Sequence, residues 1–151
     1  MEHLPTPFTA EQIRDACRGR RWKIVTEAPG AEPVVQLTEF LGSDDEGTTM
    51  RATIVGADGR PAAEPEEHRA TWEQLRQHAQ FPAESTTVDD DHITHPLGEL
   101  DTLRYTVDIG DRQRVFWFAT AYPGMPVRST TLVGGVPTST STVVESTVDA
   151  P

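Results

Sequence analysis

Apolar and polar residues alternate over residues 103–109, which is the pattern of a half-buried β-strand. Gly110-Asp111 follows, and because glycine tolerates a positive φ, a two-residue hairpin turn is predicted there. The return strand then runs from residue 112 to about 120. A turn of this length fixes the register, so that Tyr105 faces Phe116 and Leu103 faces Phe118. These four side chains are predicted to form the main core.

The return strand is also apolar on its second face, which carries Val115 and Trp117. The same register places Arg104 opposite Trp117, where a guanidinium over the indole ring would form a cation–π contact. A strand that is apolar on both faces is typical of a position where both faces are covered. We therefore expect this second face to be covered or to line a cavity.

The remaining pattern predicts two helices and a series of short strands. One helix begins after Thr9, with Gln12 completing a capping box, and ends near Arg18; the other begins after Thr71 and ends near Gln80. Further strands are predicted over residues 22–28, 33–41, 48–55, 86–95 and 127–133. Asp58-Gly59 predicts a turn into a proline-interrupted edge segment, followed by a charged connector over residues 64–69. Residues 136–147 are either a solvent-facing strand or, from about Ser146, a frayed tail.

These elements predict an α+β, mainly β fold. Hairpin-length turns join the strands, so we expect a single twisted antiparallel sheet in meander order, curled like a half-barrel. The two short helices would cover its concave face. The 151 residues correspond to one ordinary domain over residues 1–151, with residues 1–8 and about 146–151 as flexible ends.

Charge and cysteine content narrow the function classes. The chain has 24 acidic and 13 basic residues, and its formal net charge of −11 argues against nucleic acid or an anionic membrane as the main partner. No run approaches the roughly 20 apolar residues of a membrane span, and the N-terminus has no signal-peptide pattern, so a cytoplasmic location is expected. Cys17 is the single cysteine, which excludes an intrachain disulfide and a cysteine-based zinc site.

Candidate catalytic chemistry is sparse. Asp91 and His95 would share one face of their strand, and they could hold a metal ion only if other strands added ligands. A solvated acidic strand is the favoured interpretation. The sequence contains no Gly-x-Ser-x-Gly elbow and no phosphate-binding glycine loop. We therefore predict no catalytic residues, no metal and no cofactor.

One stretch carries a family resemblance. Residues 96–107, the strand Val-Phe-Trp-Phe-Ala at 115–119 and the turn Pro-Gly-Met-Pro-Val at 123–127 resemble a pattern in uncharacterised bacterial proteins. The opening Thr-Pro-Phe-Thr-Ala-Glu-Gln-Ile-Arg at 6–14 is similar to actinobacterial members. Some of these proteins look like the lipoprotein-carrier fold, a curved sheet around short helices that shelters acyl chains. The resemblance covers about the last third of the chain well; its motifs are structural and imply no functional residues.

Three functional hypotheses follow. The favoured one is a small binding protein that holds an apolar molecule or a lipid between the sheet and the helices. Its site would be lined by Trp22, Trp72, Tyr105, Phe116 and Phe118. The same residues also fit a filled core. The alternatives are an acidic inhibitor-like or immunity-like domain that binds a basic protein, and a metal-dependent enzyme that uses His95 and Asp91.

Overall fold

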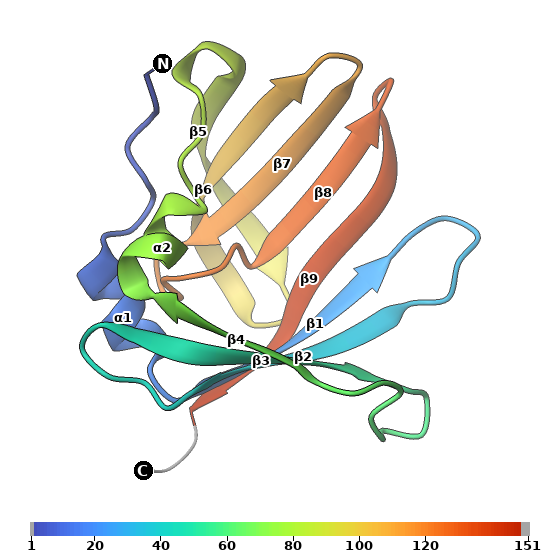
Figure 1. Cartoon of the computed structure of the whole chain (residues 1–151). Helices are drawn as coiled ribbons and strands as arrows, with labels where there is room; N and C mark the ends of the chain where they lie inside the picture. The colour runs from blue at the N-terminus through green and yellow to red at the C-terminus, as the bar shows by residue number, and fades with distance from the viewer. Residues whose placement is uncertain (1, 149–151) are drawn as a thin grey trace.

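The computed structural model describes residues 2–148 as one nine-stranded antiparallel sheet with two short α-helices (Figure 1). The strands are β1 (Arg20–Glu27), β2 (Val34–Leu41), β3 (Gly47–Val55), β4 (Glu66–Thr71), β5 (Thr86–His95), β6 (Gly98–Ile109), β7 (Arg112–Ala119), β8 (Arg128–Val133) and β9 (Val136–Val148). The helices are α1 (Ala10–Cys17) and α2 (Trp72–Gln77), with a 3₁₀ turn η1 (Ala83–Ser85). The predicted fold class is confirmed.

The sheet is a meander whose first and last strands pair with each other in the middle. Its order is β4-β3-β2-β1-β9-β8-β7-β6-β5. The two edges are therefore β4 and β5, which are neighbours in sequence. Residues 72–85, here called the edge linker, run from one edge to the other and contain α2 and η1. Figure 1 shows the sheet bent, with α1 and α2 packed together in its concave side.

Both helices begin as their sequence predicts. The Thr9 hydroxyl accepts a hydrogen bond from the Gln12 backbone N–H, and the Gln12 side chain accepts one from the Thr9 N–H. Thr71 and Gln74 form the same capping box at the start of α2. Each box satisfies two backbone donors that have no partner within the helix. The second helix ends at Gln77, three residues before the predicted boundary.

The central hairpin has the predicted register. Tyr105 pairs with Phe116 and Leu103 pairs with Phe118, while Gly110 adopts a φ of +65° in the turn. The predicted cation–π contact between Arg104 and Trp117 does not form. The Arg104 guanidinium donates to the Asp91 carboxylate, and the cation that lies over the Trp117 ring is Arg128, 6.0 Å from the centroid.

The edge strand lies later in the chain than the sequence pattern predicts. Pro61 makes only an isolated bridge with Val55, and the strand forms later, at residues 66–71, where the sequence pattern predicts a charged connector. Proline has no N–H to donate to a strand ladder, so pairing beyond the turn does not propagate from it. Pairing resumes at Glu66, and Arg51 and Glu67 then form an ion pair across β3 and β4 at 2.6 Å.

Residues near both ends of the described range pair or pack with the rest of the fold. The polar strand β9 is mostly exposed or half-buried and lies between β1 and β8, and its pairing with β1 continues through Ser146 to Val148. Residues 149–151, which the predicted tail also included, lie outside the described residues. Near the N-terminus, the Leu4 N–H donates to the Phe81 carbonyl and Phe8 is buried in the core. Residues 2–8 therefore lie against the edge linker.

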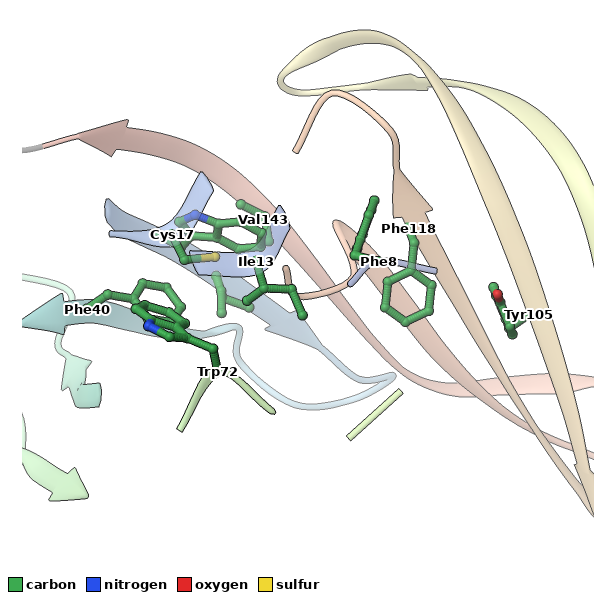
Figure 2. Close-up of a cluster of buried hydrophobic side chains, with 10 residues drawn as sticks. Phe8, Ile13, Cys17, Phe40, Trp72, Tyr105, Phe118 and Val143 are labelled. Atoms are coloured by element: carbon green, nitrogen blue, oxygen red, sulfur yellow. The ribbon is translucent and has the colours of Figure 1, made fainter. Parts of the chain in front are cut away.

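Buried apolar side chains form a main cluster on the concave side and a smaller one on the other face. The main cluster contains Phe8, Ile13, Cys17, Trp22, Ile24, Phe40, Trp72, Tyr105, Phe118 and Val143. Figure 2 shows Cys17 and Ile13 near Phe40 and Trp72, with Phe8, Phe118 and Tyr105 farther along the sheet. The smaller cluster is Leu100, Ala119 and Val127, with Trp117 and Tyr122 against it. The loop after β7 therefore covers part of the second face of the hairpin.

Candidate functional site

A cavity of about 260 Å³ lies on the concave side between the sheet, the helices and the loop after β7. This space, here called the apolar cavity, is bordered mainly by aromatic, aliphatic and methionine side chains. The lining residues are Ile13, Cys17, Phe40, Met50, His68, Leu75, His78, Ala79, Phe81, Phe116, Phe118, Gly124, Met125 and Pro126. Ligand pockets are commonly concave and apolar with a few polar groups, and this cavity has that character.

The edge linker forms one wall of the cavity. Leu75 comes from α2, Ala79 from the turn that follows it, and Phe81 from the segment just before η1. The Phe81 ring stacks on Phe116 with centroids 5.1 Å apart, and it also lies 5.4 Å from the Tyr105 ring. A segment that joins the two sheet edges therefore closes the concave side over the aromatic rings of β6 and β7.

The five predicted lining residues occupy two different places. Phe116 and Phe118 line the apolar cavity. Trp22, Trp72 and Tyr105 are instead buried in the core around it and are not among its lining residues. The structure therefore contains both arrangements that the sequence allowed, a filled core and a cavity beside it.

Hydrogen bonds explain the placement of two of these core aromatics. The Trp72 indole N–H donates to the Asp44 carbonyl at 2.7 Å, and the Tyr105 hydroxyl donates to the Pro5 carbonyl at 3.1 Å. Burial raises the pKa of the Tyr105 phenol. Trp22 differs, because within residues 2–148 its buried indole N–H has no hydrogen-bond partner.

Several lining residues are absent from the site that the sequence predicts. Phe40 belongs to a predicted strand, and the sequence pattern indicates only that a helix ends just before Phe81. Both side chains nevertheless border the cavity. Met50 and Met125 lie on β3 and in the turn after β7, far apart in the chain. Period-2 alternation could have indicated the inward face of Phe40 and Met50. No local signal brings a loop methionine to that face.

The loop after β7 packs tightly against α1. The Cys17 thiol donates to the Pro123 carbonyl with a sulfur–oxygen distance of 3.4 Å. Gly124 adopts a φ of +130°, and a Cβ atom there would lie 2.6 Å from the Cys17 sulfur. Burial raises the pKa of the Cys17 thiol to about 12. The thiol therefore stays protonated at neutral pH and acts as a small apolar wall residue, not as a nucleophile.

The residues considered for a metal site are held by other contacts. The Asp91 carboxylate accepts from the Arg104 guanidinium at 3.1 Å and from the Trp117 indole N–H at 3.0 Å. His95 is buried, and its two ring nitrogens bond the Val127 carbonyl and the Leu97 N–H. Among residues 2–148, no group of three or more His, Cys, Asp or Glu is arranged to hold a metal ion. Binding of a basic protein by the acidic surface stays a prediction.

His95 is expected to make stability depend on pH. Burial lowers its pKa despite the hydrogen bond to the Val127 carbonyl, and the Arg128 charge lowers it further. A histidine with a lowered folded pKa contributes stability above its unfolded pKa of about 6.5, and this contribution is lost as pH falls through the folded pKa. We expect His95→Gln to cost about 1–3 kcal/mol at pH 7.5, and the difference from wild type to shrink below about pH 6.5. Urea unfolding across this range measures both effects.

His92 provides a matched control on the same strand. It is exposed and lies 2.8 Å from both Asp101 and Glu99, and hydrogen bonds to those two carboxylates raise its pKa. A raised folded pKa contributes stability below about pH 6.5 that is lost as pH rises through the folded value. His92→Gln should therefore show the opposite pH trend. Parallel trends in the two variants would contradict the assignment of His95 as a buried neutral group.

Comparisons with known proteins give little guidance to function. No family model matches this sequence, and no curated protein matches it. Among solved structures, a LolA superfamily protein from Nitrosomonas europaea is similar over 95% of this chain and 96% of that chain, with a TM-score of 0.30 and 12% identity. A likeness at this level is too low to carry a functional argument. Within residues 2–148, no helix has the length and apolar character needed to cross a bilayer.

Proposed function

We propose that the protein binds a small apolar molecule or a single acyl chain in the apolar cavity. The carrying observation is the cavity itself, which remains beside a well-filled core and is lined mainly by carbon and sulfur side chains. Its volume of about 260 Å³ lies just below the range of about 300–1,000 Å³ that is typical of small-molecule sites, which suits one compact apolar group.

The composition of the walls supports this proposal. The rings of Phe40, Phe81, Phe116 and Phe118 supply rigid apolar area, and burying such a surface contributes about 25 cal/mol per Å². Met50 and Met125 add flexible side chains that adapt to irregular ligands. The part of the lining that residues 2–148 supply contains no Asp, Glu, Lys or Arg, so an apolar ligand would leave no unpaired permanent charge there.

Filling the cavity should weaken binding strongly. Ala79 lines the cavity, and Ala79→Trp places an indole where the ligand would lie. Titration with the neutral fluorescent probe N-phenyl-1-naphthylamine is expected to show saturable binding to the wild type and at least about tenfold weaker binding to this variant. Burial of each methylene-sized group contributes about 0.8 kcal/mol to the free energy of binding. Loss of two such groups therefore exceeds the roughly 1.4 kcal/mol that corresponds to a tenfold change in affinity.

The matched control is Ala121→Trp, in the exposed part of the loop after β7 and outside the cavity lining. It adds the same indole at the surface and should bind the probe like the wild type. Thermal unfolding of all three proteins reports whether each is folded. Equal binding by Ala79→Trp and Ala121→Trp, with both folded, would show that the probe does not enter the apolar cavity.

A further inference from the structure

A second cavity adjoins the first one on the concave face. It measures about 250 Å³ and is lined by Ile24, Thr26, Val34, Gln36, Met125, Pro126, Ser129, Ser141 and Val143. Met125 and Pro126 line both cavities, so the loop after β7 forms the wall between them. We call the second one the polar groove, because its side chains include three hydroxyls and one amide, whereas those of the apolar cavity include neither group.

Strand register shows that the polar groove continues into the apolar cavity. Thr26 pairs with Ser141, Ser141 pairs with Ser129, and Ser129 pairs with Phe116. Residues directly opposite each other in an antiparallel sheet point to the same face. The three hydroxyls therefore form a row across β1, β9 and β8 that ends at an aromatic wall of the apolar cavity.

Two polar atoms in the groove are available to a ligand. The Thr26 and Ser141 hydroxyls bond each other at 2.8 Å, and the Gln36 side-chain N–H donates to the Thr38 hydroxyl at 3.0 Å. Within residues 2–148, the Ser129 hydroxyl and the Gln36 side-chain oxygen have no hydrogen-bond partner. Neither atom belongs to the buried side-chain atoms that lack a partner, so both are open to solvent, and a ligand in the groove can replace water at them.

The uncharged lining of the groove favours an uncharged head group. The sequence has 24 acidic and 13 basic residues, yet among residues 2–148 no Asp, Glu, Lys or Arg lines the polar groove or the apolar cavity. A charged head group there would lose hydration without gaining an ion-pair partner. An uncharged head group with hydroxyls can both donate to Gln36 and exchange hydrogen bonds with Ser129.

From these observations, and resting on the proposed function, we infer that the ligand is an uncharged amphiphile with one apolar chain and a hydroxyl-bearing head. The chain occupies the apolar cavity, and the head lies in the polar groove on Gln36 and Ser129. Glycerol and sugar heads share this chemistry. Met125, in the wall between the two cavities, contacts the junction of chain and head.

A matched series of twelve-carbon amphiphiles tests the inference. Displacement of N-phenyl-1-naphthylamine is measured below micelle formation for monododecanoylglycerol, dodecyl glucoside, dodecanoate and dodecyltrimethylammonium. We expect the glycerol ester, the glucoside or both to bind about tenfold or more tightly than either ion. The glycerol and glucoside arms distinguish the two head types.

Two substitutions then locate the head group. The variant Gln36→Leu with Ser129→Ala should weaken binding of the preferred uncharged amphiphile about tenfold, because each neutral hydrogen bond contributes roughly two- to tenfold. Binding of dodecanoate and of the probe should change little. The control is Thr142→Val on β9, which faces away from the groove because its neighbours Ser141 and Val143 line it.

The outcomes separate the two proposals. If neither the probe nor any amphiphile binds, the proposed function fails, and this inference fails with it. If they bind but an ion binds as tightly as the uncharged amphiphiles, the head-group assignment is overturned while the apolar cavity remains a binding site. The head-group assignment is also overturned if the double variant Gln36→Leu with Ser129→Ala binds all ligands as tightly as Thr142→Val does.

Discussion

Phe118→Ala is expected to lower the free energy of unfolding by about 3–5 kcal/mol, which is the usual cost of removing a large buried ring. Phe118 is only 2% exposed. Its ring lies 5.4 Å from Tyr105, 6.2 Å from Phe8 and 6.4 Å from Phe81, measured between centroids. It thereby joins the central hairpin, the N-terminal segment and the edge linker. Urea unfolding followed by circular dichroism measures the change.

A control variant on the same hairpin tests whether the loss of stability depends on burial of the apolar side chain. Ile109 is 52% exposed near the turn, so Ile109→Ala should change stability by no more than about 0.5 kcal/mol. Domains of this kind are stable by about 5–15 kcal/mol, so the loss at Phe118 would be a large fraction of the total. Similar small losses in both variants would contradict a core centred on Phe118.

Gly124→Ala is expected to cost about 2–6 kcal/mol for two separable reasons. A side chain at a φ of +130° strains the backbone, which costs about 1–3 kcal/mol. The new Cβ would also lie 2.6 Å from the Cys17 sulfur, and overpacking of this kind costs about 1–3 kcal/mol. Because the loop is part of both cavity walls, probe binding should weaken as well.

A double-mutant cycle with Cys17→Ala distinguishes the two causes. Removing the sulfur relieves the steric contact but not the backbone strain, so Gly124→Ala should cost at least about 1 kcal/mol less in that background. Gly135→Ala is the control for backbone strain without a steric contact. Gly135 has a φ of +82°, and a Cβ atom added there would meet no atom of residues 2–148 within 4 Å. An equal cost of Gly124→Ala in both Cys17 backgrounds would show that the loop does not pack against the Cys17 side chain.

Much of the fold follows from local sequence patterns. The register of the central hairpin follows from the length of its turn, and the two helix starts follow from Thr9 with Gln12 and Thr71 with Gln74. Each of these features depends on residues close together in the chain. The alternation of apolar and polar positions and the chemistry of short turns therefore determine them without knowledge of the rest of the molecule.

The candidate site could be predicted only in part. Phe116 and Phe118 belong to the strongest strand pattern, and they line the apolar cavity. Trp22, Trp72 and Tyr105 have the same large aromatic character, but composition does not show whether a ring fills the core or borders a space. That difference depends on where neighbouring elements stop, and here the edge linker and the loop after β7 set those limits.

Local sequence patterns were enough to predict most of the strands, the hairpin turns, the helix caps and the antiparallel class of this protein, but not the edge strand β4 at residues 66–71. The three-dimensional structure was needed to show that β9 pairs with β1, with Val148 opposite Arg20, and that the polar groove meets the apolar cavity. Local patterns record interactions between residues near in sequence. The pairing of the two chain ends, and the spaces left between packed elements, depend on contacts between distant residues and on how completely their side chains fill the volume.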